Sequence, residues 1–396
     1  MNYRIEAHKE LTKFGECVSG LLKYDGSQAV TSCTFYNQPI QIRNTAESGC
    51  NPTSCRTCDG GCLLASEYQD SSGVAAIARR VNVGLGNINA TSVCGLVFRS
   101  TKKFRYDRGT QIDGLIGLGY SPKGGFPTVI DSWIKQNQLA DVFSIQLGPR
   151  GGAFSLGGYN PNYFTGDINW APIMPSAHWY QVPLLSISVQ NSKLKFSKSE
   201  KQARTIIDSG TTHLLVPTAT FNKLTQKITA HVSKSAPTVP ASISAAWENS
   251  FFNKANCYTD VDLSWLPNID FEFKRKLSAA EKKAKISKSF KLTMKPEDYL
   301  YLQGTVEGKP CYSYGIGTGS NSMFIFGDTF MTSYYSIFDR QNNRLGFAYS
   351  SKSSTVSPTT EPVTIAQIPE FASAPDFLVP KLSFLIIVIV LFLVIM

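Results

Sequence analysis

The residues whose types and spacing best fit catalysis lie in one short segment of the 396-residue sequence, from Thr205 to Thr212. Two isoleucines lead to the carboxylate of Asp208, which is followed by small and hydroxyl-bearing residues: Ser209, Gly210, Thr211 and Thr212. Glycine lets the backbone turn sharply, and hydroxyl groups can hold a carboxylate in one orientation. A carboxylate held in this way at the end of a buried strand is suited to general acid–base catalysis. The structural alternative is an Asx-turn that joins two strands.

Short strands are predicted to position this segment. Apolar residues make up 42% and charged residues 17% of the chain, which excludes a disordered protein or a coiled coil. Alternating patterns and short apolar runs predict strands at 111–120, 143–147, 180–189, 324–327 and 334–349. Helical spacing of apolar residues predicts helices at 126–140 and 221–232. The predicted fold class is therefore mostly β.

Two segments of similar pattern indicate an internal duplication. Asp113–Gly119 and Met323–Asp328 each combine a short apolar run with glycine, and they lie about 210 residues apart. Each falls late in its half of the chain, which favours two related β lobes. The length of the chain agrees with two domains of ordinary size.

Taken together, these motifs resemble those of the pepsin-like aspartic proteases. Asp208–Thr212 resembles the second catalytic loop of that family, and Ile325–Asp328 resembles the strand that lies beside the loop. Asp113–Gly119 is similar to the counterpart of this strand in the first lobe. Tyr68 resembles the tyrosine of the flap, the hairpin that covers the substrate. The resemblance extends from about Cys50 to Tyr349 and favours a cysteine-rich, membrane-anchored member whose N-terminus is incomplete.

The resemblance implies a bilobal fold with a cleft between an N-terminal lobe at 1–165 and a C-terminal lobe at 166–350. It implies a flap near 66–76 and a disulfide between Cys257 and Cys311. It also implies that Asp208 is catalytic and that five residues bind substrate, namely Tyr68, Ser209, Gly210, Thr211 and Thr212. The implied protein is a monomeric aspartic endopeptidase that hydrolyses polypeptides and needs no metal or cofactor.

The first of the two carboxylates that this family uses is not evident in the sequence. Two carboxyl groups held close together cannot both ionise, so one acts as a base on water and the other as an acid on the peptide carbonyl. No Asp-Ser-Gly or Asp-Thr-Gly precedes the flap, and Asp25-Gly26-Ser27 is the nearest match. We favour a first aspartate located upstream of Met1 over Asp25 in its place. The alternative function is an inactive pepsin-like pseudoprotease that binds peptides.

Nine cysteines indicate disulfides and an oxidising compartment. Six of them lie between Cys17 and Cys62 in an irregular stretch, and their pairing is left open by their spacing. The spacing of Cys55 and Cys58 would also suit zinc, but no histidine and no second pair of this spacing accompany it. The glycosylation sequon that begins at Asn89 agrees with a secreted glycoprotein.

The C-terminal end of the sequence predicts attachment to a membrane. A Ser/Thr/Pro-rich stalk at 351–377 precedes a hydrophobic segment at 378–396. This segment fits either a transmembrane tail or a GPI signal that is cleaved off. The first ten residues are polar and lack the apolar core of a signal peptide, so we expect that the true beginning is missing. The expected location is the secretory pathway, at the cell surface or in an acidic vacuolar or lysosomal compartment.

The formal net charge of +10 does not by itself indicate nucleic-acid binding. Lysines concentrate in one segment, Lys274–Lys288, and no Arg-rich helix is evident, so we expect no nucleic-acid partner. That segment is expected to be a surface insertion in the C-terminal lobe. A serine hydrolase is also disfavoured, because the sequence holds no Gly-x-Ser-x-Gly motif.

Overall fold

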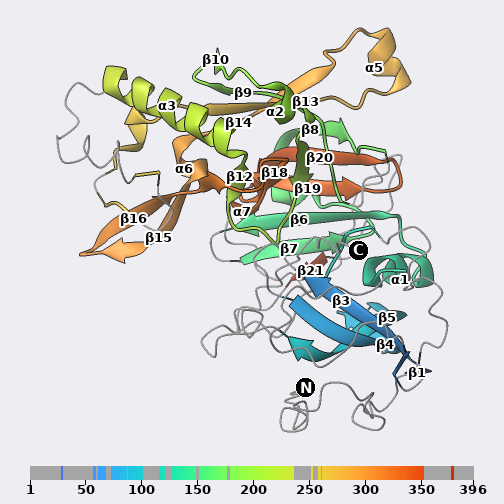
Figure 1. Cartoon of the computed structure of the whole chain (residues 1–396). Coiled ribbons are helices and arrows are strands. Elements are labelled where there is room, and N and C mark those ends of the chain that lie inside the picture. The colour runs from blue at the N-terminus through green and yellow to red at the C-terminus, as the bar shows by residue number, and fades with distance from the viewer. Residues whose placement is uncertain are drawn as a thin grey trace. The chain divides into compact units, whose positions relative to one another are not determined.

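The computed structural model of the chain describes residues 28–29, 57–58, 61–67, 73–86, 88–100, 116–120, 127–148, 151–175, 179–235, 251–252, 257–259, 261–351 and 376–378. These residues form two compact units, one made of the described residues up to Leu139 and the other of those from Ala140 onward (Figure 1). Strands dominate both units, so the predicted fold class, mostly β, is confirmed.

The first unit is built on one antiparallel sheet. Its strands are β1 (Gln28–Ala29), β2 (Thr57–Cys58), β3 (Gly61–Glu67), β4 (Gly73–Leu85) and β5 (Ile88–Ser100). Strand β4 is the centre of the sheet, because it pairs with β1, with β3 and, along its length, with β5. The long β4–β5 hairpin provides the surface that holds the helix of this unit.

Helix α1 (Val129–Gln136) begins at the capping residue Thr128 and confirms the predicted helix in a shorter form. Its Ile130 and Trp133 side chains are buried, as the spacing predicts. The indole Nε1 of Trp133 donates to the carbonyl of Val83 on β4 at 2.9 Å. The side-chain amide of Gln136 bonds both backbone groups of Thr91 on β5, at 2.9 and 2.8 Å. The helix is therefore fixed to both strands of the hairpin.

The second unit contains a six-stranded antiparallel sheet. Its strands, in spatial order, are β21 (Asp376–Leu378), β7 (Gly151–Leu156), β6 (Val142–Gly148), β19 (Tyr334–Asp339), β20 (Arg344–Ser350) and β8 (Phe164–Pro172). Strands β6, β19 and β20 confirm the predictions at 143–147 and 334–349. Strand β8 passes through the expected lobe boundary at 165/166, which stays a prediction.

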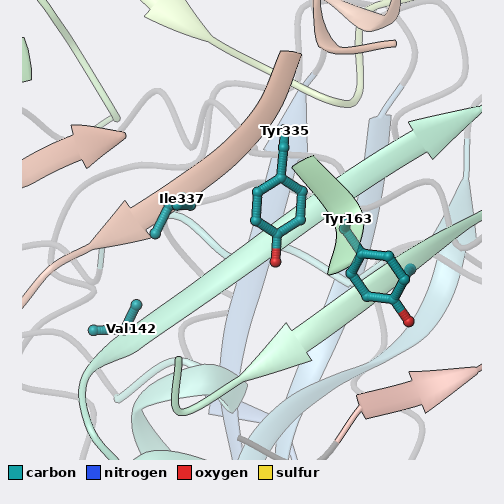
Figure 2. Close-up of a cluster of buried hydrophobic side chains, with 5 residues drawn as sticks. Val142, Tyr163, Tyr335 and Ile337 are labelled. Atoms are coloured by element: carbon teal, nitrogen blue, oxygen red, sulfur yellow. The ribbon is translucent and has the colours of Figure 1, made fainter. Parts of the chain in front are cut away.

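Buried aromatic residues hold this six-stranded sheet together. Figure 2 shows Val142, Tyr163, Tyr335 and Ile337, which belong to one buried cluster. The Tyr335 hydroxyl lies 2.6 Å from Ser144 Oγ and accepts a hydrogen bond from the backbone N–H of Asn160 at 3.0 Å. The buried Tyr335 hydroxyl is thus hydrogen-bonded, which explains why a tyrosine is tolerated there.

A second sheet of this unit has the order β10-β9-β13-β14, with bounds β9 (Leu184–Val189), β10 (Ser192–Lys193), β13 (Ile269–Lys274) and β14 (Ser289–Met294). The strand predicted at 180–189 thus begins at Leu184. A separate hairpin is formed by β15 (Leu300–Val306) and β16 (Lys309–Tyr314). The helices of the unit are α2 (Lys198–Gln202), α3 (Thr218–Ser235), α5 (Ala279–Lys283), α6 (Pro296–Tyr299) and α7 (Asp328–Met331).

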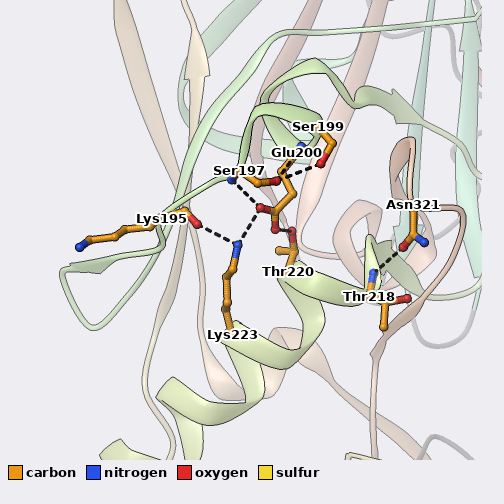
Figure 3. A network of polar contacts seen from close by, with 8 residues as sticks. All are labelled: Lys195, Ser197, Ser199, Glu200, Thr218, Thr220, Lys223 and Asn321. Carbon is orange, nitrogen blue, oxygen red and sulfur yellow. Dashed lines mark hydrogen bonds and ion pairs between the residues drawn. The ribbon is translucent and has the colours of Figure 1, made fainter.

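Helices α2 and α3 are joined through the buried carboxylate of Glu200 (Figure 3). One oxygen accepts from Thr220 Oγ1 at 2.7 Å, and the other accepts from Lys223 Nζ at 2.7 Å and from Ser197 N at 2.6 Å. Lys223 also donates to the carbonyl of Lys195 at 2.9 Å. Burial alone would raise the pKa of Glu200, but these hydrogen bonds from Lys223, Ser197 and Thr220 prevail and lower it to about 2.

We expect Glu200→Gln to destabilise the protein by roughly 2 kcal/mol at pH 6. A carboxylate with a lowered pKa in the folded state contributes stability above its unfolded pKa, and this contribution is lost as the pH falls toward about 2. The difference between variant and wild type in urea unfolding should therefore shrink between pH 5 and pH 2. Glu297→Gln, at an exposed position, is the matched control and should change stability by less than about 0.5 kcal/mol. A constant difference across this pH range would contradict the assignment.

Residues 116–120, predicted as part of a buried strand, lie outside any strand, although Leu118 is buried; the glycines at 117 and 119 interrupt strand geometry, which explains the difference. The expected stalk and hydrophobic segment lie outside the described residues, apart from Ser351 and the three residues of β21. In the described part of the chain, no helix combines the length and the apolar character needed to cross a bilayer.

Candidate active site

The predicted catalytic segment lies in a third, four-stranded sheet of the second unit. Its strands have the order β11 (Arg204–Ile207), β18 (Met323–Phe326), β12 (Leu214–Val216) and β17 (Ile316–Thr318). Strand β18 thus lies between the two strands that the loop 208–213 connects, parallel to β11 and antiparallel to β12. The loop must therefore cross the end of β18, which brings it against the residues that follow this strand.

Backbone hydrogen bonds fix the loop to the end of β18. The Asp208 N–H donates to the carbonyl of Phe326 at 3.0 Å, where β11 ends. After the crossing, the Asp328 N–H donates to the carbonyl of Thr211 at 2.7 Å, and the Thr329 N–H donates to that of Thr212 at 3.0 Å. The geometry of the loop is therefore set by residues far away in the sequence, and not by its own residues alone.

The crossing is tightest at Gly327. A Cβ atom there would collide with the carbonyl oxygen of Thr211 and lie 2.5 Å from that of His213. Both are backbone atoms, so neither could rotate away as a side chain would. Glycine is required here for close approach of two chain segments.

The loop holds the carboxylate of Asp208 in one orientation. The residue is only 9% exposed. Its Oδ1 accepts from the backbone N–H of Gly210 at 2.9 Å, and its Oδ2 accepts from the Thr211 hydroxyl at 2.7 Å. Hydrogen bonds to a charged acceptor are stronger than neutral ones, so the carboxylate is well fixed. The Gly210 bond is the one an Asx-turn would make, so the turn and the oriented carboxylate are one feature.

Asp328, the first residue of α7, provides a second carboxyl group near Asp208. Its Oδ1 is buried and has no hydrogen-bond partner among the described residues. Burial, and to a smaller degree the negative charge of Asp208, raises the pKa of Asp328 to about 8. At acid and neutral pH Asp328 is thus protonated and neutral, and Asp208 has no second negative charge beside it. Asp328 was not among the predicted site residues; its signal in the sequence is an acidic residue that follows the apolar run of β18 after a single glycine, Gly327.

The residues predicted to bind substrate in this loop differ in their accessibility. Gly210 and Thr212 are exposed and Thr211 is half-buried, whereas Ser209 is buried. The carbonyl of Thr212 is occupied, because it accepts both from the N–H and from the hydroxyl of Thr329. Contact of these residues with a substrate stays a prediction, and Gly210 and Thr212 are best placed for it.

The expected flap segment, 66–76, is an antiparallel hairpin as far as the structure describes it. Strands β3 and β4 pair with Glu67 opposite Gly73. Tyr68 lies outside the described residues, as do Asp25 and Asp113. The positions of the flap tyrosine and of the first catalytic carboxylate therefore stay predictions.

The disulfide expected between Cys257 and Cys311 is present and bridges two segments 54 residues apart. It attaches residues 257–259 to β16, where Tyr258 and Tyr312 also pair through their backbones. Cys94 on β5 is half-buried and takes part in no disulfide, and burial raises the pKa of its thiol. The side chains of the six cysteines from Cys17 to Cys62 are not among those described.

The geometry thus provides one fixed carboxylate, Asp208, with a buried neutral carboxyl behind it. A fixed carboxylate can take a proton from water, and a base of this kind needs a separate acid to protonate the other reactant. Within the described residues, no group of three or more His, Cys, Asp or Glu side chains is placed to hold a metal ion.

Comparison with known proteins gives a consistent result. Residues 53–350 match the family model described as eukaryotic aspartyl protease. The chain is 27% identical over 293 residues to a beta-secretase of Strongylocentrotus purpuratus, which covers 67% of this chain and 52% of that protein. It is 30% identical over 251 residues to cathepsin E of Mus musculus, a match that covers 60% of this chain and 54% of that protein. It is 26% identical over 273 residues to pepsin A of Sus scrofa, a match that covers 67% of this chain and 61% of that protein. The chain thus spans about half to three-fifths of the length of these relatives.

Proposed function

Because the chain belongs to the eukaryotic aspartyl protease family, we propose that it acts as an aspartic endopeptidase in which Asp208 is one of two catalytic aspartates. The observation that carries this proposal is the orientation of Asp208 by Gly210 and Thr211 at the end of β11. The substrates are polypeptides, and Tyr68, with the loop residues that follow Asp208, contacts them.

In the proposed mechanism, a water molecule held by Asp208 and a second carboxyl group attacks the peptide carbonyl. The ionised carboxyl takes a proton from the water while the protonated one donates to the carbonyl oxygen, which yields a tetrahedral intermediate. The second carboxyl belongs to the N-terminal half of the protein, either as Asp25 or as a residue outside the given sequence. Asp328 does not replace it, since its carboxyl oxygen is buried behind the loop.

The compartment and the attachment of the protein are part of the same proposal. The disulfide between Cys257 and Cys311 supports a route through the secretory pathway, where disulfides form and persist. We extend the proposal to a monomer with lobes at 1–165 and 166–350, attached to a membrane through 378–396. Vesicle flotation of the full chain with and without residues 378–396 tests the attachment.

Cleavage of a denatured protein at pH 4 in water enriched in oxygen-18 tests the proposed chemistry. Direct attack by water places one heavy oxygen in each new C-terminal carboxylate and leaves no acyl group on the enzyme, which mass spectrometry can check. Products from wild type and none from Asp208→Ala would support the endopeptidase. An acyl-enzyme trapped by hydroxylamine would contradict it.

A pseudoprotease is the second candidate, because the sequence holds a single Asp-[Ser/Thr]-Gly motif, at Asp208. Binding of a denatured polypeptide without any cleavage by the full-length natural protein would favour this candidate over the enzyme. The same assay therefore separates the two functions.

A further inference from the structure

The lysine-rich segment of the sequence forms the outer end of a hairpin. Strands β13 and β14 pair from Ile269 opposite Met294 to Lys274 opposite Ser289. Between them lies the short helix α5, at the far end of the hairpin from the sheet (Figure 1). We call residues 276–288, which include α5, the basic tip. Most of its residues are exposed, as expected, and its origin as an insertion stays a prediction.

The base of the hairpin is fixed to neighbouring elements, so the basic tip is held in place. The N–H of Lys276 donates to the carbonyl of Trp170 on β8 at 2.7 Å, and that of Arg275 donates to the carbonyl of Lys288 at 2.8 Å. The guanidinium of Arg275 donates to Asn169 Oδ1 at 3.0 Å and lies 5.3 Å from the centre of the Phe290 ring. Arg275 is therefore engaged within the fold, and the lysines beyond it carry the free charge.

The basic tip has a strong excess of positive charge. It contains five exposed lysines, Lys276, Lys282, Lys283, Lys285 and Lys288, and one acidic residue, Glu281. The Glu281 carboxylate accepts from the Ser278 N–H at 2.8 Å, and the Ser278 hydroxyl accepts from the Glu281 N–H at 3.2 Å. This capping box directs the only acidic side chain to the start of α5. Among the described residues, none of the five lysines forms an ion pair.

An apolar side chain lies among these lysines. Ile286 is 44% exposed and directly follows Lys285, whose φ of 56° ends the helix in a left-handed turn. The Ile286 N–H donates to the carbonyl of Glu281 at 3.1 Å, so the backbone at this turn is fixed. An exposed isoleucine in a lysine-rich segment is the combination that inserts into the headgroup region of an anionic bilayer.

From these observations we infer that the basic tip is a docking surface for an anionic membrane. Lysine ammonium groups attract anionic lipid headgroups within about a Debye length, roughly 10 Å at 0.1 M salt. Ile286 adds an apolar contact that would favour binding to a bilayer but not to a nucleic acid. Arg275, the side chain best suited to phosphate recognition, is already bound to Asn169 and packed on Phe290. The inference does not depend on Asp208 or on proteolysis.

Co-sedimentation of the full chain with vesicles tests the inference. The vesicles contain either phosphatidylcholine alone or phosphatidylcholine with 30% phosphatidylserine. Any binding through the C-terminal hydrophobic segment occurs with both kinds of vesicle and can be subtracted. Combined substitution of Lys282, Lys283 and Lys285 by glutamine should lower the phosphatidylserine-dependent part of the partition coefficient roughly a hundredfold, since each lysine contributes about fivefold. Arginine at the same three positions should preserve binding, and 0.5 M NaCl should abolish it.

The matched control is glutamine at Lys195, Lys198 and Lys201, three exposed lysines of the same unit. This control removes the same charge and should change partitioning less than threefold. Equal losses in both triple variants would overturn the inference, because net charge alone would then explain binding. Wild-type binding in the tip variant would also overturn it, as would a loss of heparin or RNA binding without a loss of vesicle binding. Ile286→Ser should lower the partition coefficient severalfold on the charged vesicles only.

Discussion

Replacement of Asp208 by asparagine is expected to lower kcat/KM at pH 4 by at least about a thousandfold, because asparagine cannot accept a proton from water. The side chain keeps its size, and its Oδ1 can still accept the hydrogen bond from the Gly210 N–H. The amide group can donate to the Thr211 hydroxyl, which rotates to accept. The variant should therefore fold with a melting temperature close to that of wild type. The effect is measured as the rate at which wild type and Asp208→Asn, at equal concentration, cleave a denatured protein.

A graded series around Asp208 separates chemistry from folding. Thr211→Ser keeps the hydroxyl that bonds Asp208 Oδ2 and should retain activity within a few fold, whereas Thr211→Val removes it and should lose roughly ten- to a hundredfold. If Asp208→Asn cleaves as fast as wild type, Asp208 is not catalytic, whatever the order of the Thr211 variants. A melting temperature lowered by many degrees in Asp208→Asn would instead assign the carboxylate a structural role.

The orientation of the Asp208 carboxylate could be predicted from the sequence because the residues that bind it are its near neighbours in the chain. The residues that bind Asp208 lie two and three positions after it, and their types alone indicate the turn. Helix α1 and strands β6, β19 and β20 were likewise predictable from periodicity. Helix α5 also had a local signal in the sequence, since Ser278 and Glu281 have the spacing of a capping box.

The features that could not be predicted depend on contacts between distant parts of the chain. Insertion of β18 between β11 and β12 joins segments separated by more than 100 residues, as the sequence separation of 117 between Thr212 and Thr329 illustrates. The requirement for Gly327 follows from that crossing and not from its neighbours in the sequence. The raised pKa of Asp328 has the same origin, because burial and Asp208 cause it.

Replacement of Asp328 by asparagine is expected to change how stability depends on pH. Its pKa is about 8 in the folded protein, against an ordinary value of 3.8, so the folded state binds one more proton than the unfolded state between these pH values. The wild-type free energy of unfolding should therefore fall by about 1.4 kcal/mol per pH unit in this window on account of Asp328. Asparagine removes this term, so the variant should become more stable relative to wild type by up to ~5 kcal/mol as the pH rises from 4 to 8.

Urea unfolding of both proteins at several pH values between 4 and 8 measures this change, with Asp167→Asn, at an exposed position on β8, as the control that removes the same charge from the surface. The control should follow the wild-type curve, whereas the Asp328→Asn curve should be flatter. Parallel curves for Asp328→Asn and wild type would contradict a buried, protonated Asp328. Activity at pH 4 should change only severalfold in Asp328→Asn, because a neutral side chain replaces a neutral one. Asp328 thus costs the fold little stability at acid pH, where its carboxyl is neutral, and lowers stability increasingly as the pH rises toward 8.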